Sequence, residues 1–368
     1  MRPTIRIPFT SPFPPAIIAP KSAQSAEGAI DAVINFLTAR APQKLEGANL
    51  HKTVVLTGAG VSVASGLSDY RGEDGVYRKN QQYRPIYYHE FASKHISRQR
   101  YWSRSFVGWP GFQNAKPNSI HRVIKALHDK GYISSIVTQN VDSFHSNLEI
   151  PVVELHGYLR EVVCIHCRKH ILRDWFQSQL KELNPDWARF LKRMIEAGAL
   201  DARNTDKQIQ LGLKLNPDGD VDLPGAPYGT FRYPACPTCL NSPPTLKDGT
   251  TAHVEVDDDG AWMPTSNAGI LKPAVIMFGE SIDPLTKQRA EEAIDGAGRL
   301  LILGSSLATL SAWRLVERAH QRGMAIGVIN VGGIRNEKTI FGSKDETSHV
   351  RINQPLEQIL PTVCDRLQ

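Results

Sequence analysis

Four of the five cysteines have the spacing of a metal site. They form two pairs, Cys164-x-x-Cys167 and Cys236-x-x-Cys239. Paired thiolates at this spacing hold Zn²⁺ in a tetrahedron of sulfur atoms, and four protein ligands leave no position for a reactive water. The sequence therefore predicts one structural Zn²⁺ per chain, and Cys364 remains as a packing residue.

A glycine-rich turn could bind phosphate. Gly58-Ala59-Gly60 follows the apolar run 53–57, which predicts a buried strand leading into a tight turn. Main-chain amides in such a turn can point at a phosphate group. A dehydrogenase fingerprint requires a third glycine at the position of Val63, so hydride transfer fits this turn poorly.

Amide, acid and imidazole groups follow the next two predicted strands. Gln139-Asn140-Val141-Asp142 comes directly after one strand, and His156 ends the following one. Ligands bind at the carboxyl ends of parallel strands in open α/β sheets. Histidine is the side chain that exchanges a proton near neutral pH, so His156 is our candidate general base.

Two further groups of side chains suit a polar ligand. Asp69-Tyr70-Arg71 places an acid, a ring and a cation just after the glycine turn. Tyr101 and Arg104 lie three residues apart, so they share one face of a predicted helix. A guanidinium is a planar fork that matches a carboxylate, although an ion-paired or surface arginine is the alternative.

Strands and helices alternate at both ends of the chain. This pattern predicts an α/β fold with a Rossmann-like parallel sheet. The strand tips GAG, QNVD, GSS and NVGG would then line one edge of the sheet as a groove. The predicted strands are 53–57, 133–138, 152–155, 274–278, 300–303 and 325–329, and the predicted helices are 26–40, 117–127, 284–294, 312–322 and 355–366.

Composition divides the chain into three parts. Residues 26–157 and 262–368 should form the Rossmann-like domain, and 158–261 a small zinc-ribbon domain with a long insertion between its cysteine pairs. Residues 1–25 carry six prolines and Arg2, Arg6 and Lys21 but no acid. This composition is typical of a mitochondrial transit segment and predicts the mitochondrial matrix, a disordered tail being the alternative.

Charge and hydropathy bear on the partners. The net charge is +6, and the three basic residues of the first 25 positions account for half of it. The remainder is spread along the chain, so no nucleic-acid partner is expected. No apolar run approaches the ~18 residues of a membrane span.

The motifs in this order resemble the sirtuins, which are NAD-dependent protein lysine deacylases. The resemblance covers roughly residues 26–367 and is carried by GAGVSVASGLSDYR, TQNVD, ELHG, the paired CxxC, FGE, GSS and NVG. RYWSRSFVGWP, TQNVDSFH and LNPDGDVDL resemble the class II, mitochondrial, sirtuin-four-like branch.

The resemblance implies a Rossmann-like domain, a small zinc domain, and a cleft that takes NAD and an acylated lysine of a protein substrate. NAD would be consumed as a co-substrate, and Zn²⁺ would be structural. The cofactor-binding residues that it implies are Gly58, Ala59, Gly60, Asp69, Tyr70, Arg71, Gln139, Asn140, Val141, Asp142, Gly304, Ser305, Ser306, Asn330, Val331, Gly332 and Leu356.

The resemblance also implies a mechanism. The acyl oxygen attacks the nicotinamide ribose carbon and nicotinamide leaves. His156 then acts as general base on a ribose hydroxyl, which accepts the acyl group and gives O-acyl-ADP-ribose. Asn140 and Asp142 would assist at the nicotinamide end. The substrate contacts would be Tyr101, Arg104, Phe278, Gly279 and Glu280, with a preference for acidic or long acyl groups as a hypothesis.

Three other functions fit parts of the sequence. Protein ADP-ribosyl transfer would use the same NAD groove without requiring His156. A redox dehydrogenase is disfavoured by Val63, and a non-catalytic zinc module leaves the strand-tip motifs without a purpose. Ala308-Thr309-Leu310 departs from the sirtuin pattern after GSS and could alter the adenosine side of the groove.

Overall fold

The chain folds into two compact units. The computed structural model describes residues 13–39, 49–72, 75–79, 84–200, 213–215, 220–223, 225–342 and 348–367. The first unit comprises Met1–Arg84, Lys116–His156 and Ile282–Gln368. The second comprises Pro85–Ala115 and Gly157–Ser281. Three segments of sequence therefore combine into the first unit.

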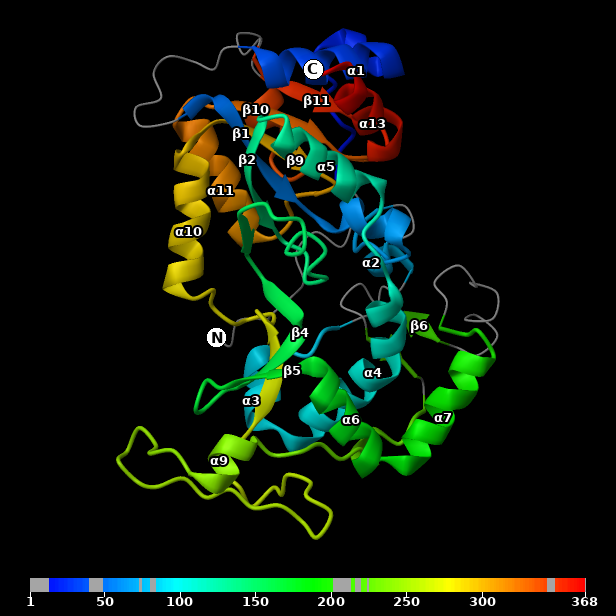
Figure 1. Cartoon of the computed structure of the whole chain (residues 1–368), viewed down its shortest axis with the longest axis vertical. Coiled ribbons are helices and arrows are strands. Elements are labelled where there is room, and N and C mark those ends of the chain that lie inside the picture. Colours follow the sequence, from blue (N-terminus) through cyan, green and yellow to red (C-terminus); the bar gives the residue numbers. More distant parts are fainter. Residues whose placement is uncertain are drawn as a thin grey trace. The chain divides into compact units, whose positions relative to one another are not determined.

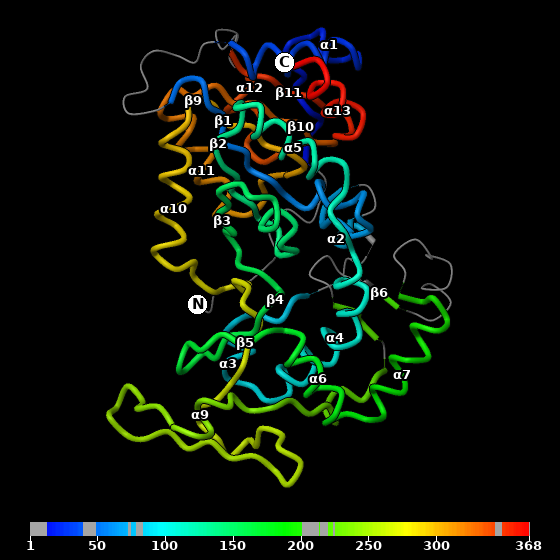
Figure 2. The backbone as a smooth tube through the Cα atoms, viewed as in Figure 1, coloured from blue at the N-terminus to red at the C-terminus, as the bar shows by residue number. Residues whose placement is uncertain are grey.

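A six-stranded parallel sheet forms the centre of the first unit. Its strands are β1 (Asn49–Thr57), β2 (Ile133–Thr138), β3 (Val152–Glu154), β9 (Ala297–Leu303), β10 (Ala325–Ile329) and β11 (Val350–Ile352). Their order across the sheet is β11-β10-β9-β1-β2-β3. The chain order reverses between β1 and β9, which lie side by side although they are far apart in sequence (Figure 2). Parallel α/β sheets bind ligands at such a reversal.

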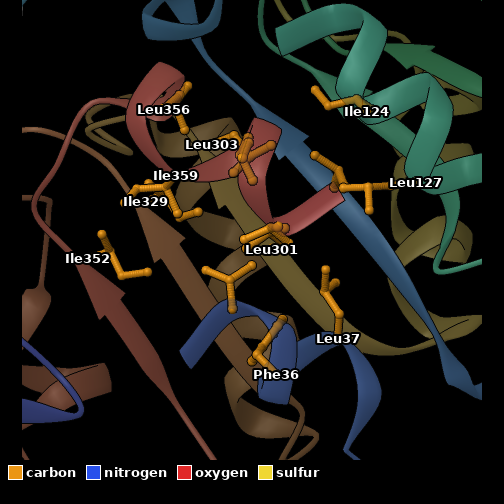
Figure 3. Packing of buried hydrophobic residues seen from close by; sticks show 14 of the residues in the cluster. Phe36, Leu37, Ile124, Leu127, Leu301, Leu303, Ile329, Ile352, Leu356 and Ile359 are labelled. Carbon is orange, nitrogen blue, oxygen red and sulfur yellow. The ribbon is translucent and has the colours of Figure 1, made fainter. Parts of the chain in front are cut away.

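Both faces of this sheet are buried, because neighbouring residues of each strand point to opposite faces. Val55 and Leu301 pack into one hydrophobic cluster, and Val54 and Leu300 into another. The first cluster joins the strands to side chains from α1, α5 and α13, such as Phe36 (Figure 3). The sheet is thus a rigid core whose loops can carry the chemistry.

Helices cover the two faces of the sheet. One face carries α1 (Ala26–Thr38), α5 (Ser119–Asp129) and α13 (Leu356–Arg366), and the other carries α10 (Pro284–Asp295) and α11 (Leu310–Gln321) (Figure 1). The parallel sheet and its helices confirm the predicted Rossmann-like α/β fold. The shorter helical segments are η1 (Lys21–Gln24), η2 (Ala59–Ser65), α2 (Val76–Lys79) and α12 (Glu337–Phe341).

The second unit is built on a small antiparallel sheet, in the order β5-β4-β8. An aromatic cluster that includes Trp102, Phe176 and Phe231 forms its core. Among the residues that the structure describes, no helix of either unit is long and apolar enough to cross a membrane. The elements are α3 (Tyr88–Ser93), α4 (His95–Asn114), β4 (Gly157–Cys164), β5 (His170–Leu172), α6 (Arg173–Leu183), α7 (Pro185–Glu196), β6 (Lys214–Leu215), β7 (Val221–Asp222), η3 (Tyr228–Thr230), α9 (Pro237–Asn241) and β8 (Leu271–Val275).

The unit boundaries differ from the predicted domains. Residues 85–115 and 262–281 were predicted to belong to the Rossmann-like domain, but they pack in the second unit. The reason for α4 is its apolar face: the ring centroids of Trp102 and Phe176 lie 4.4 Å apart. The strand predicted at 274–278 for the parallel sheet is instead β8, which pairs antiparallel with β4.

Part of the predicted transit segment belongs to the first unit. Residues 1–12 lie outside the described residues, but Ala19 exchanges main-chain hydrogen bonds with Arg351 of β11. The N–H of Ile17 donates to Glu337 Oε1 at 2.9 Å, and Ala23 is 1% exposed in the core. These contacts cover the edge of β11, so a separate segment 1–25 does not describe this part of the chain.

Candidate functional site

The carboxyl ends of the parallel strands are aligned by main-chain hydrogen bonds that continue past each strand. The N–H of Gly58 donates to the carbonyl of Leu303, and that of Gln139 donates to the carbonyl of Thr57, both at 3.0 Å. Because of these hydrogen bonds, the loops after neighbouring strands begin at the same edge of the sheet. The loops with predicted cofactor residues are 58–60, 139–142, 304–306 and 330–332.

Two of these loops touch through bare main chain. The N–H of Gly60 donates to the carbonyl of Gly304 at 2.9 Å. A Cβ added at Gly60 would lie 2.7 Å from the Cα of Gly304, and Gly304 itself has a φ of +58°. Only glycines permit this approach at the reversal of strand order. The two loops therefore meet with no side chain over the contact, which leaves room for a pyrophosphate close to the main chain.

An amide and an acid converge on this turn. Asn140 is buried, and its Nδ2 donates to the carbonyl of Gly58 at 3.0 Å. The hydroxyl of Ser62, in η2, donates to Asp142 Oδ2 at 2.7 Å. Burial raises the pKa of Asp142 above its ordinary value, and the Ser62 bond opposes that rise. The structure thus joins the predicted Asn140 and Asp142 to the glycine turn.

His156 follows β3 and is held at both ring nitrogens. Nδ1 lies 3.1 Å from the carbonyl oxygen of Gln139, and Nε2 lies 2.7 Å from Ser311 Oγ. Since a carbonyl oxygen can only accept, Nδ1 carries the proton and Nε2 accepts from the Ser311 hydroxyl. His156 is half-buried in the structure, and burial lowers the pKa of its imidazole to about 4. The imidazole is therefore neutral at pH 7.

The Gln139 side chain links the loops after β1, β2 and β9. Its Nε2 donates to Ser305 Oγ at 2.7 Å, and its Oε1 accepts from Thr309 Oγ1 at 3.2 Å. Ser305 is buried, and its hydroxyl also accepts from the N–H of Leu307 at 3.1 Å. Ala59, Val141 and Ser306 lie in the same loops and are half-buried. The predicted residues from these three loops therefore meet.

The loop after β10 is held by a buried ion pair. Arg351 is 0% exposed, and its Nε lies 2.7 Å from Glu337 Oε1. The same guanidinium donates to the carbonyls of Asn330 and Gly332. Val331 remains 58% exposed at the tip of this loop. The predicted residues 330–332 thus form a fixed loop with an open apolar surface.

Other predicted cofactor residues are placed differently. Asp69, Tyr70 and Arg71 are half-buried in the loop that follows η2, where the Arg71 guanidinium lies 4.8 Å from the centre of the Tyr77 ring. Leu356 is 5% exposed and packs in the core cluster of Figure 3. Leu356 begins α13 with its side chain in the core, and its role in cofactor binding stays a prediction.

The four paired cysteines form one cluster in the second unit. Cys164 ends β4, Cys167 lies in the following turn, and Cys236 and Cys239 flank the first turn of α9. Their sulfur atoms all lie within 4.8 Å of one another. The sulfur atoms of Cys164 and Cys239 lie 3.6 Å apart, and those of Cys167 and Cys236 are also 3.6 Å apart, so the two pairs meet.

This cluster fits Zn²⁺. Zn–S bonds of about 2.3 Å in a tetrahedron place sulfur atoms about 3.8 Å apart. A hydrogen bond from the Cys164 thiol lowers the pKa of Cys236, which favours the thiolate form that binds Zn²⁺. Three of the four cysteines are buried. The site is closed, as a structural metal site requires.

Arg104 differs from its prediction. Its side chain is 2% exposed, and its Nη2 lies 2.9 Å from Asp220 Oδ2. Asp222 lies 3.8 Å from its Nε. Tyr101 on the same helix packs edge-on against Phe91 and Trp102. The carboxylate partner of Arg104 is thus supplied by the chain itself, so this arginine does not support a preference for acidic acyl groups.

Glu280, in the segment predicted to pair with substrate, turns into its own unit. Its Oε2 accepts from the N–H of Met277 at 2.9 Å and lies 3.1 Å from Lys272 Nζ. The carbonyl of Phe278 accepts from the N–H of Tyr88, and Gly279 is exposed with a φ of +81°. Glu280 therefore holds this loop in place instead of offering its carboxylate to a ligand.

Four polar residues of these sites were missed by the sequence reasoning. Ser62 lies next to the glycine turn, and Ser311 lies in the first turn of α11. A single hydroxyl carries no periodic signal. The position of Ser62 after GAGV was the only local hint. Arg351 and Lys272 lie inside strands, where a lone basic residue reads as solvent-exposed until its partners are known.

Comparison with known proteins identifies the class. The profile described as the Sir2 family matches residues 58–311. NAD-dependent protein deacylase SIR4 of Batrachochytrium dendrobatidis is 37% identical over 325 residues, which are 86% of this chain and 90% of that protein. NAD-dependent protein deacylase SRT2 of Arabidopsis thaliana is 33% identical over 318 residues, 85% of this chain and 73% of that protein.

The fold agrees with this. The structure of a Sir2–p53 peptide–NAD⁺ complex aligns with a TM-score of 0.53 at 20% identity, covering 91% of this chain and 97% of that one. The chain belongs to the Sir2 family, the sirtuins. It is an NAD-dependent protein deacylase, with NAD as co-substrate and a four-cysteine structural zinc site.

Proposed function

We propose that the protein removes acyl groups from lysine side chains of protein substrates. In this proposal His156 is the general base of the deacylation. The single observation that carries this role is the hydrogen bond from Nδ1 to the Gln139 carbonyl. This bond fixes the proton on Nδ1 and leaves the lone pair of Nε2 to accept a proton. A neutral ring is required for this, and the pKa of about 4 keeps His156 neutral at physiological pH.

The neighbouring groups have matching roles in this proposal. Gly60 and Gly304 present the main chain to the pyrophosphate, and Asn140 and Asp142 hold the nicotinamide end. The acyl oxygen would bond to the sugar carbon of NAD as nicotinamide leaves it. His156 would then withdraw the proton from a neighbouring sugar hydroxyl as that oxygen bonds to the acyl carbon, and water would displace the lysine nitrogen from the same carbon. The products are nicotinamide, the free lysine and O-acyl-ADP-ribose.

Substitution of the imidazole tests the proposal. His156→Ala is incubated with an acetyl-lysine peptide and NAD, and the products are separated by mass spectrometry. The variant should keep the wild-type melting temperature and zinc content and lose O-acyl-ADP-ribose formation by at least about a hundredfold, the usual size of general-base catalysis. Wild-type product formation by this variant would refute the base assignment.

Protein ADP-ribosyl transfer is the second candidate, because the same strand-tip loops would bind NAD for it. The two activities leave different products. With NAD that carries a label in its adenosine, deacylation releases all label in O-acyl-ADP-ribose. Label that stays on the protein, and persists in His156→Ala, would favour transfer.

We further propose that the protein works in the mitochondrial matrix. Support comes from the composition of the first residues, which have basic side chains and no acid. The contacts of Ile17 and Ala19 restrict the leader, since these residues cover the edge of β11. A leader would therefore end before Ile17. The N-terminal sequence of the protein recovered from mitochondria tests both points, and recovery only from the cytosol would refute the proposal.

A further inference from the structure

Ser311 contacts the candidate base although the two residues are 155 positions apart in the sequence. Its Oγ lies 2.7 Å from Nε2 of His156, the shorter of the two hydrogen bonds of that ring. Since Nδ1 donates to the Gln139 carbonyl, the hydroxyl must be the donor to Nε2. The ring is therefore held at opposite ends by a main-chain carbonyl and a hydroxyl.

The hydroxyl is delivered from a rigid element. Ser311 is the second residue of α11, and the next two residues, Ala312 and Trp313, are buried in the core beneath the sheet. Thr309, directly before the helix, donates to Oε1 of Gln139 at 3.2 Å. The start of α11 thus contacts both His156 and Gln139, whose carbonyl binds the imidazole, and it differs from the sirtuin pattern at Thr309.

We propose that Ser311 is a positioning residue for His156. Its hydroxyl sets the rotation of the imidazole, whose tautomer the Gln139 carbonyl already fixes. This inference rests on the proposed role of His156 as general base. A sugar hydroxyl that approaches Nε2 takes the place of the serine hydroxyl. Because the ring already has the required orientation, the lone pair of Nε2 points at the substrate.

The proposal distinguishes two stages of the reaction. Release of nicotinamide does not require the base, whereas transfer of the acyl group to the sugar hydroxyl does. A neutral hydrogen bond contributes about 1 kcal/mol, which corresponds to roughly a fivefold change in rate. Loss of the hydroxyl should therefore slow the second stage and leave the first stage nearly unchanged.

The test compares Ser311→Ala with Ser311→Thr, which restores a hydroxyl, and with Arg314→Ala, an exposed change on the same helix. Exchange of labelled nicotinamide into NAD measures the first stage, and O-acyl-ADP-ribose formation measures the second. We expect Ser311→Ala to lower product formation about fivefold while exchange stays within about twofold. Ser311→Thr and Arg314→Ala should resemble the wild type.

A spectroscopic measurement detects the positioning directly. Histidine-selective ¹⁵N labelling, assigned with His156→Ala, should show one protonated Nδ1 and one unprotonated Nε2 for His156. In Ser311→Ala the Nε2 signal should shift, because this nitrogen loses its hydrogen-bond donor, while Nδ1 stays protonated. Unchanged signals with a wild-type rate, or an equal loss in both stages, would overturn the inference. Full activity of His156→Ala would instead refute the base assignment, so the two failures are distinguishable.

Discussion

Acid should destabilise the first unit through two buried histidines that take no part in the proposed chemistry. His121 and His145 are 0% and 1% exposed, and their ring centroids lie 4.9 Å apart. Burial lowers the pKa of His121 to about 4 and that of His145 to about 3. Arg122 lowers the first further, and His121 lowers the second. Both rings are therefore neutral in the folded protein.

The sign of the effect follows from these values. Unfolded histidine titrates at about 6.5, so below that pH the unfolded chain binds protons that the folded chain does not. Stability from these two groups is complete above pH 6.5 and is lost as the pH falls toward 4. Each group loses about 1.8 kcal/mol between pH 7 and pH 5, at 1.36 kcal/mol per pKa unit. Together they lower the free energy of unfolding by about 4 kcal/mol.

Cys364 provides a local reporter. It is buried in α13 and lies outside the zinc cluster, so its reaction with dithiodipyridine reports unfolding of the first unit. Labelling is measured by peptide mass spectrometry across a urea series at pH 7, 6 and 5. In the double variant His121→Gln/His145→Gln, the free energy of unfolding should depend less steeply on pH. The decrease in slope near pH 5 should be about 2.5 kcal/mol per pH unit.

Two controls make this measurement decisive. His51→Gln removes an exposed histidine of β1 and should leave the slope unchanged. The single variants at His121 and His145 should each remove about half of it, even if the double variant is too unstable to measure. A double variant with the wild-type slope would show that these rings are not neutral in the folded unit, and the reasoning would fail.

Three further predictions follow from the contacts. Cys164→Ser removes one of four thiolates, so it should lower the zinc content by metal analysis and the melting temperature of the second unit. Arg104→Leu removes the guanidinium that pairs with the buried carboxylate of Asp220, which should cost about 3–5 kcal/mol of unfolding free energy. It should reduce acetyl- and glutaryl-peptide turnover equally. A chain that begins at residue 25 loses the hydrogen bond from Ile17 to Glu337 and the two main-chain hydrogen bonds between Ala19 and Arg351. Its free energy of unfolding should therefore be about 3 kcal/mol lower.

Each of these has a contrary outcome. Unchanged zinc content in Cys164→Ser would contradict the shared metal site. Selective loss of glutaryl turnover in Arg104→Leu would restore the acidic acyl preference. The control for the shortened chain begins at residue 13 and retains the contacts of Ile17 and Ala19, so it should be about 3 kcal/mol more stable than the chain that begins at residue 25. Equal stability of the two shortened chains would contradict a structural role for Ile17.

Local sequence was enough for the elements and for much of the chemistry. The apolar runs predicted β2 and β10 at the observed bounds, because a strand buried on both faces is a short block of apolar residues. The CxxC spacing predicted the cysteine cluster, because two cysteines separated by two residues can bind the same metal ion within one turn of the chain. The glycine turn and QNVD were recognisable for the same reason: each motif does its work within a few residues.

What the sequence could not decide were the contacts between residues far apart in the chain. It placed α4 in the wrong unit, because an aromatic stripe shows that a helix is buried but not against which partner. It offered Arg104 to a ligand, while folding brings Asp220 to that guanidinium. No role for Ser311 could be read from the sequence, because its hydrogen-bond partner His156 lies 155 positions away. A side chain's type is written in the sequence, but its partner is set by the path of the chain through space.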